Sequence, residues 1–414
     1  MWISEKIIEK YESGSDWKYD LAVLLGEDVP ERRTRQHTFF LDDDLYLDCG
    51  RQELVKELEA FERKGLIKVK WYQLGSYATE FKYQLADIPN FYEILDRMPK
   101  PQKVQKQLKD VDKYLKQASK SWIIQILEKE RSQILEGKQT EDERKVLEFY
   151  DCLLGLDRLT SPTFKRVFSK QYLNNSKRFE QKYQGRILAA ARKYHDHIDE
   201  EMNDTQVLSE LYIEEYAQEL AVKGPLHLML EGRELHLEDF CYGTVLNSQT
   251  LERAQIPEHQ PIRKVISVEN KANFVSMPYE EGTLYLFSHG FFSPKEREFL
   301  VRLRKVLEYQ TEEGAGVPVE YYHTGDLDYG GLRIFRYIKE KIFPELKPLQ
   351  MDVETYHRYE TYGETMTESI RRKLEALEAS WQESEDGDAV KNLIAEMLKE
   401  GYILEQEAFL INKE

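Results

Sequence analysis

The stretch His323-Thr324-Gly325-Asp326-Leu327-Asp328-Tyr329-Gly330-Gly331 decides the fold that we expect for the second half of this chain. The apolar and aromatic run 317–322 before it predicts a buried strand. The apolar residues after it recur at helical spacing, and they are Leu332, Phe335, Ile338 and Ile342. A strand, a glycine, two aspartates and a helix, in that order, are typical of an α/β domain with a ligand site at the strand tip.

Another strand end carries a third carboxylate. Residues 265–268 are rich in β-branched side chains and predict a strand, and Glu269 follows directly. The run 283–287 predicts a strand between the two. Ligands collect beyond the carboxyl ends of strands in open α/β sheets, so we expect Glu269, Asp326 and Asp328 to converge.

Three carboxylates within a few ångströms repel one another, and a hard divalent cation removes that repulsion. Oxygen ligands favour Mg²⁺ or Mn²⁺, so these three residues are the predicted metal ligands and catalytic residues. Gly330 and Gly331 allow a phosphate to approach the backbone of the next helix. Each motif alone is weak, because an Asp-x-Asp pair in an acidic chain is more often a surface turn.

The chain from 224 to 414 predicts an α/β domain with a mostly parallel sheet. Within it, Ser293, Pro294 and Glu296 have the spacing of a helix N-terminus with a capping box. The expected buried face of that helix contains Phe299, Leu300, Leu303, Val306 and Leu307.

The first 98 residues predict a small winged-helix-like domain. A helix expected at 52–64 precedes two strands expected at 67–74 and 80–85, with Gly75-Ser76 as their turn. Such a module contacts DNA or another protein, and the mixed charge of the helix leaves both roles open.

Residues 99–160 predict a helical arm, and 161–223 predict a helical linking region. Apolar residues on the arm recur at spacings of four and three from Val104 to Ala118, which is compatible with dimerisation. Its lysines form a basic stripe, and they are Lys103, Lys106, Lys109, Lys113, Lys116 and Lys120. The stripe either follows a phosphate backbone or is an ordinary solvated helix face.

Composition limits the function classes. The net charge of −17 argues against a protein coated in basic charge for DNA. Three isolated cysteines form no Cys-x-x-Cys pair, which argues against a cysteine zinc site or a disulfide framework. We expect no signal peptide, no membrane span and a cytoplasmic location.

Several motifs resemble a known family. Val268-Glu269, Ser288-His289-Gly290-Phe291-Phe292 and Gly325–Gly331 resemble a Toprim domain, and 290–303 is similar to the topoisomerase VI A subunit. The wider pattern resembles the JetD-like nucleases of Wadjet plasmid-defence systems. Further matches to that pattern are Gly224-Pro225-Leu226-His227-Leu228, Met351-Asp352 and Leu404-Glu405-Gln406-Glu407.

The resemblance covers about 170–414 and implies a Toprim-type endonuclease that cuts closed circular plasmid DNA. It also implies partners from an SMC and kleisin complex, which is condensin-like, and a homodimer with two metal sites.

Other residues receive secondary roles. The nearest cations that could hold phosphates are Lys271, Lys295 and Arg297, and His289 could donate a proton to the leaving oxygen. Glu405 and Glu407 are outside candidates for a further metal ligand.

Two alternatives stay open. One is a tyrosine transesterase similar to topoisomerase VI, although no Arg-Tyr-Tyr sequence occurs. The other is an inactive adaptor that keeps the winged-helix and Toprim folds.

Overall fold

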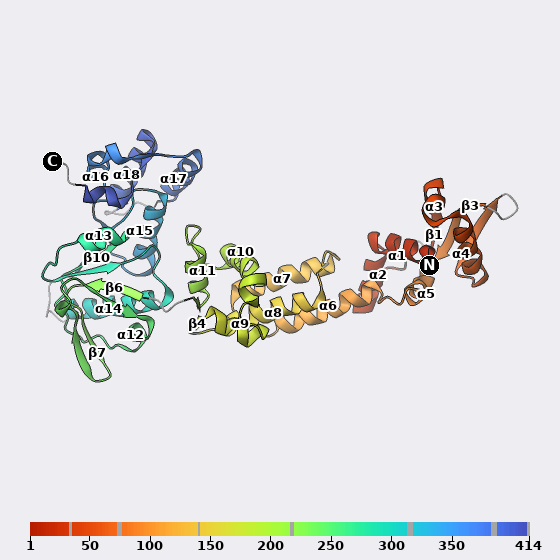
Figure 1. Cartoon of the computed structure of the whole chain (residues 1–414), viewed down its shortest axis with the longest axis horizontal. Helices are drawn as coiled ribbons and strands as arrows, with labels where there is room; N and C mark the ends of the chain where they lie inside the picture. Colours follow the sequence, from red (N-terminus) through yellow and green to blue (C-terminus); the bar gives the residue numbers. More distant parts are fainter. Residues whose placement is uncertain are drawn as a thin grey trace. The chain divides into compact units, whose positions relative to one another are not determined.

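The computed structural model describes residues 1–32, 35–72, 77–139, 141–215, 219–312, 318–381 and 387–411. The chain divides into two compact units, Met1–Asp157 and Arg158–Glu414 (Figure 1). The division falls close to the boundary that we expected between 160 and 161. Within the described part of the chain, no helix is long and apolar enough to span a bilayer.

The first unit begins with helices around a small antiparallel sheet of order β1-β3-β2. Its elements are α1 (Trp2–Ser13), α2 (Asp16–Leu25), β1 (Gln36–Phe40), α3 (Asp43–Cys49), α4 (Arg51–Arg63), β2 (Ile67–Tyr72), β3 (Tyr77–Gln84), η2 (Leu85–Asp87) and α5 (Ile88–Ile94). The expected helix and hairpin are therefore present, while the predicted Gly75-Ser76 turn lies outside the described residues.

Glu62 joins α4 to the hairpin. Its carboxylate accepts hydrogen bonds from the Val69 amide at 2.9 Å and from Trp71 Nε1 at 2.8 Å. The apolar face of α4 is buried through Leu54, Leu58 and Phe61. This leaves α4 facing solvent with the mixed charge seen in the sequence, so its role in binding DNA or protein stays a prediction.

Three helices follow, α6 (Lys100–Leu115), α7 (Ser121–Leu135) and α8 (Glu143–Arg158). The apolar seam of α6 is buried inside the unit at Val104, Leu108 and Val111, because α6 packs against α7 and α2. That seam is therefore a core face, and it is not available to a second copy of the chain.

The basic stripe is shorter than we expected. Lys103, Lys109, Lys113 and Lys116 are exposed on or just after α6. Lys106 is also exposed on α6 and pairs with Glu143 at 2.7 Å, whereas Lys120 is partly buried and donates to the Leu156 carbonyl at 2.7 Å. Lys120 precedes α7, where its own amide and the Ser119 amide donate to Asp157, so it belongs to a helix junction and not to the stripe.

The second unit starts with helices and two short paired strands. These elements are β4 (Thr163–Phe164), α9 (Lys165–Leu173), the π-helix η3 (Phe179–Tyr183), α10 (Gln184–Tyr194), α11 (Asp204–Glu210) and β5 (Ile213–Glu214). The prediction of a helical region up to 223 is wrong at its end, because β6 (Glu219–Lys223) is a strand of the central sheet. Pairing with two neighbouring strands and burial of Leu220 and Val222 outweigh helix propensity there.

The central sheet has the order β13-β12-β10-β11-β6-β9. Its other strands are β9 (Thr244–Asn247), β10 (Lys264–Val268), β11 (Thr283–Phe287), β12 (Glu320–Thr324) and β13 (Lys347–Pro348). The four strands from β13 to β11 are parallel, whereas β6 and β9 pair antiparallel. The sheet is therefore mixed, because β6 and β9, which precede β10 in sequence, extend it beyond β11.

Two predicted strands around the site match closely, and one is displaced. The runs expected at 265–268 and 283–287 are β10 and β11. The strand expected at 317–322 begins at Glu320 and continues to Thr324. Pro318 supplies no amide, and the parallel register with β10 starts at the pair Lys264 and Glu320.

The remaining elements of the unit are helices, short strands and a hairpin. They are the hairpin β7 (His227–Leu230) and β8 (Arg233–His236), then η4 (Leu237–Asp239), α12 (Ser248–Arg253), α13 (Lys271–Ser276), α14 (Pro294–Glu312), α15 (Tyr329–Lys341), α16 (Val353–Arg358), η5 (Glu360–Tyr362), β14 (Glu364–Thr365), α17 (Glu368–Ser380), α18 (Gly387–Glu400), β15 (Tyr402–Ile403) and η6 (Gln406–Leu410). The predicted capping box of α14 is confirmed, since Ser293 and Glu296 exchange hydrogen bonds of 2.7 and 3.4 Å.

Candidate metal centre

The tips of β10 and β12 lie side by side. Their register pairs Val268 with Thr324, and the Glu269 amide donates to the Thr324 carbonyl at 3.0 Å. Glu269 and Gly325 are therefore neighbours at the ends of two adjacent strands. These strands are distant in sequence, since 55 residues separate the hydrogen-bonded residues Ser267 and Tyr322. The register therefore places Glu269 beside the tip of β12, where Asp326 and Asp328 follow in sequence.

Glu269 reaches directly to the Asp326 backbone. The Asp326 amide donates to Glu269 Oε2 at 3.1 Å. A Cβ atom on Gly325 would lie 2.3 Å from the same oxygen, closer than atoms can approach. Residue 325 must therefore be glycine for Glu269 to hold this position.

Asp328 caps the helix after β12. It is the N-cap of α15, and its Oδ1 accepts the Gly331 amide at 2.7 Å. A Cβ on Gly331 would lie 2.2 Å from the Asp326 carbonyl oxygen, so the turn between Asp326 and α15 requires glycine at this position. Asp328 is thus a structural cap as well as a predicted metal ligand.

A segment from the far end of the chain completes the site. Leu327 and Leu404 exchange two backbone hydrogen bonds of 2.8 and 3.1 Å. The Gln406 amide then donates to Asp326 Oδ1 at 2.7 Å, and the Gln406 side chain donates to Thr324 Oγ1 at 2.9 Å. These contacts place the residues on either side of Gln406 next to Asp326.

Glu405 and Glu407 are those residues. Asp326, Glu405 and Glu407 each offer a carboxylate oxygen, and the three atoms lie within 4.8 Å of one another. Among the described residues, these three carboxylates are spaced closely enough to hold one metal ion. Glu269 and Asp328 instead accept hydrogen bonds from the amides of Asp326 and Gly331. The sequence made Glu405 and Glu407 outside candidates for a metal ligand, and the structure places a carboxylate oxygen of each beside Asp326.

The carboxyl groups raise one another's pKa. Partial burial and the charge of Asp326 raise the pKa of Glu269. Partial burial also raises the pKa of Asp326, and Asp328, Glu405 and Glu407 add to it. The pKa of Asp328 is raised chiefly by burial. The cluster therefore holds protons that a cation would displace.

This arrangement fits a hard divalent ion. It supplies several carboxylate oxygens, two of its members are exposed, and burial together with neighbouring carboxylates raises the pKa values of Glu269 and Asp326. Asp326, Glu405 and Glu407 would hold the ion.

His323 lies beneath the cluster and is structural, as its position in β12 indicates. Its Nδ1 lies 2.8 Å from Ser267 Oγ, and complete burial lowers its pKa to about 3. Its Nε2 has no hydrogen-bond partner among the residues that the structure describes.

Lys271 and His289 line one cavity of about 370 Å³, together with Phe287. Lys271 is exposed at the start of α13, and its ammonium lies 5.0 Å from the Phe287 ring centre. His289 Nε2 lies 3.0 Å from Glu296 Oε1. Desolvation opposes protonation of His289, but the hydrogen bond and charge of Glu296 raise its pKa above the ordinary value.

Lys295 and Arg297 are held by ion pairs, so we do not retain them as phosphate contacts. Lys295 is 8% exposed and lies 3.2 Å from Glu298. Arg297 contacts both carboxylate oxygens of buried Glu210, at 2.8 and 3.1 Å. Both residues lie in the first turn of α14 and line a cavity of about 660 Å³.

Comparison with known proteins agrees with the geometry. Residues 225–413 match the family model "Wadjet protein JetD, C-terminal". The chain is also 29% identical over 370 residues to Wadjet protein JetD of Bacillus cereus (strain Q1), which covers 88% of this chain and 87% of that protein. The family match includes the strand tips and the C-terminal segment that form the acidic cluster. The chain is therefore a JetD-like protein with a JetD C-terminal domain.

Proposed function

We propose that this chain is a divalent-metal-dependent endonuclease of Toprim type that hydrolyses phosphodiester bonds of plasmid DNA in a Wadjet defence system. The similarity to a Wadjet protein supports the biological setting. The observation that carries the activity is the meeting of Asp326, Glu405 and Glu407 at the tips of parallel strands.

The chain's own residues would divide the work. Asp326, Glu405 and Glu407 would hold Mg²⁺ or Mn²⁺, and the ion would supply Lewis acidity toward the phosphate and water. Glu269 keeps one oxygen on the Asp326 amide, and its other oxygen accepts a proton from the attacking water. The amides of Gly330 and Gly331 lie in the first turn of α15, where the helix dipole favours an anion.

His289 is suited to proton donation. Its hydrogen bond with Glu296 favours the protonated imidazole, which can deliver a proton to the leaving oxygen. Lys271 lines the same cavity and supplies a positive charge for a phosphate.

Incubation with closed circular plasmid tests the proposal. Purified protein is mixed with plasmid and Mg²⁺ or Mn²⁺, alone and together with an SMC and kleisin complex. We expect cutting that requires the metal and that Asp326→Ala reduces at least about 100-fold, as loss of a key metal ligand implies. Folded Asp326→Ala that cuts as well as the parent would contradict the assignment.

A covalent tyrosine mechanism gains no support from the tyrosine that directly follows Asp328. Tyr329 is 7% exposed, and its hydroxyl donates to Glu200. Denaturation during cutting separates the two mechanisms, because hydrolysis leaves no protein attached to DNA ends. Protein-linked ends would favour the transesterase.

Partner proteins and self-association follow from the same proposal. A homodimer would place one metal site on each strand of the duplex, and its interface cannot use the buried seam of α6. Sedimentation of the purified chain, with and without the SMC complex, measures both associations.

A further inference from the structure

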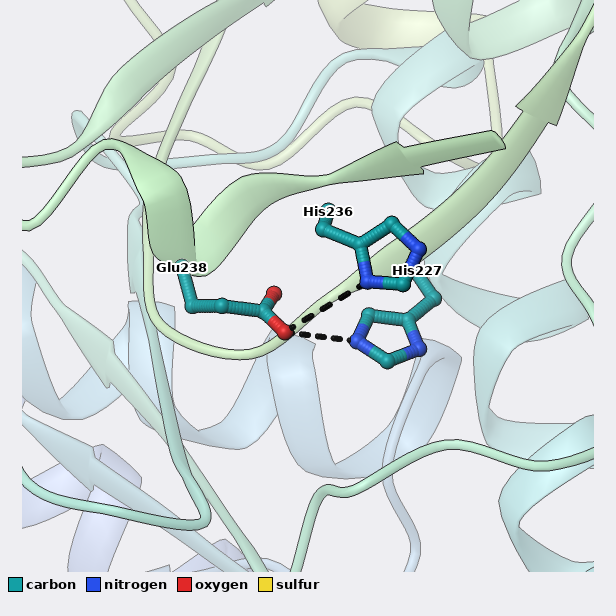
Figure 2. Close-up of side chains that lie close together, drawn as sticks. All are labelled: His227, His236 and Glu238. Atoms are coloured by element: carbon teal, nitrogen blue, oxygen red, sulfur yellow. Dashed lines mark hydrogen bonds and ion pairs between the residues drawn. The ribbon is translucent and has the colours of Figure 1, made fainter. Parts of the chain in front are cut away.

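A second cluster of ligand-type side chains lies on the β7–β8 hairpin and the η4 turn after it (Figure 2). His227 and His236 are directly opposite each other in the antiparallel register. Residues opposite each other in such a pair project from the same face, so the two imidazoles meet, with ring centres 4.1 Å apart.

Glu238 faces both rings. His227 Nε2 lies 2.7 Å from Glu238 Oε1, and His236 Nδ1 lies 3.7 Å from the same oxygen. The three ligand atoms lie within 4.8 Å of one another. The other oxygen, Glu238 Oε2, is buried and has no hydrogen-bond partner among the described residues.

We infer that His227, His236 and Glu238 form a binding site for a first-row transition ion, with Zn²⁺ as the best fit. Bond lengths of about 2.0–2.1 Å put ligand atoms ~3.3 Å apart around tetrahedral Zn²⁺. The two distances to Glu238 Oε1 lie on either side of that separation, so small side-chain rotations would complete the site. Two imidazoles and one carboxylate select Zn²⁺ over Mg²⁺, which prefers oxygen ligands alone.

The surroundings support a preorganised site. The backbone of His227 is fixed by Gln260, which is 3% exposed and bonds the His227 amide and carbonyl at 2.9 and 3.0 Å. On the far side of the other ring, His236 Nε2 lies 3.6 Å from Glu234 Oε2, so a small rotation would let Glu234 accept a hydrogen bond from a metal-bound His236.

The cluster is open to solvent, so an ion can enter and keep a water ligand. The side chains of His227 and Glu238 are 25% and 28% exposed, and that of His236 is 44% exposed. The bound ion would fasten the hairpin to η4. This site is separate from the acidic cluster, since the two share no residue.

Zinc content and cobalt spectroscopy test the site on the full-length chain. After exposure to Zn²⁺ in millimolar Mg²⁺ and dialysis, we expect one Zn²⁺ per chain by elemental analysis. Co²⁺ in its place should give the visible absorption of a four-coordinate site with nitrogen ligands. His227→Gln and His236→Gln should each weaken Zn²⁺ binding at least about tenfold.

Two control variants make the test specific. His357→Gln removes another imidazole that contacts glutamates, at 3.0 Å from Glu396 and 3.7 Å from Glu360. No second histidine is part of that group, so Zn²⁺ binding should not change. Asp326→Ala should keep the zinc, which separates this site from the proposed nuclease centre. Equal zinc binding by the parent and the double variant His227→Gln with His236→Gln would overturn the inference, as would loss of zinc in Asp326→Ala.

Discussion

The Asp326 carboxylate is stabilised by a hydrogen bond and destabilised by neighbouring negative charges. Its side chain accepts one backbone hydrogen bond, from Gln406, while Glu405 and Glu407 crowd it with like charge. An asparagine would keep the hydrogen bond and remove the repulsion. A carboxylate that destabilises the metal-free protein is therefore one that the proposed chemistry needs.

Asp326→Asn should consequently raise metal-free stability while removing activity. We expect a gain of about 1 kcal/mol in the free energy of unfolding, after allowance for solvent screening. Thermal unfolding in chelator measures the gain, and plasmid cutting measures the loss. A variant that is less stable than the parent in chelator would show that the carboxylates do not repel.

Burial of the carboxyl groups, together with the same repulsion, makes metal-free stability depend on pH. The pKa values of Glu269 and Asp326 are raised in the folded chain, so the folded state holds protons that the unfolded state releases. Stability should therefore fall as pH rises from about 4, the ordinary carboxyl range, through neutral pH. Melting temperatures across that range in chelator check the slope, and saturating Mg²⁺ should flatten it.

Sequence reasoning found Asp326, Asp328 and Glu269 because each directly follows a strand or begins a helix, where local patterns are informative. It ranked Glu405 and Glu407 low because their approach depends on contacts across 80 residues, between Asp326 and Gln406. It missed His236 and Glu238, since it sought zinc ligands among the cysteines, and only the hairpin register brings His227 opposite His236.

At the scale of elements, the turn into α15 depends on one glycine. Gly331→Ala would place a methyl carbon 2.2 Å from the Asp326 carbonyl, so the turn must move and carry Asp326 with it. We expect at least about a tenfold loss of cutting, although no carboxylate changes. Gly185→Ala is the matched control, because its added Cβ meets nothing within 4 Å. Equal activity of the two variants would argue against a rigid turn.

The end of α13 depends on a strand residue. Lys223 of β6 is 3% exposed, and its ammonium donates to the carbonyls of Phe274, Val275 and Met277 at 3.1, 3.1 and 2.9 Å. Lys223→Met would leave those acceptors without their donor and destabilise the unit by about 2 kcal/mol. Urea unfolding measures the change, with Lys264→Met on the partly exposed start of β10 as the control.

The elements that the sequence predicted poorly share a cause. β6 has a composition that also suits a helix, and it becomes a strand because β11 and β9 offer it partners on both sides. β12 starts later than its apolar run because its parallel register with β10 sets the first pair. Local propensity places long amphipathic helices such as α14 well, while pairing between distant segments decides short strands.

At the scale of the whole molecule, the net charge of −17 opposes unaided binding to DNA. We expect the lone chain to bind duplex DNA with a Kd of about 10⁻⁶ M or weaker at physiological salt. Fluorescence anisotropy over a salt series, with Asp326→Ala to prevent cutting, measures this affinity. Nanomolar binding without a partner would contradict the idea that another complex delivers the DNA.

The segment around Gln406 also bears on synthesis of the protein. A nascent chain that has emerged from the ribosome only as far as α18 can already form the central sheet, but it lacks Glu405, Glu407 and the Gln406 amide that orients Asp326. Under the proposed function, products of premature termination or of proteolysis before this point would be harmless to the host chromosome. Under the proposed function, metal binding would therefore require translation through Glu407.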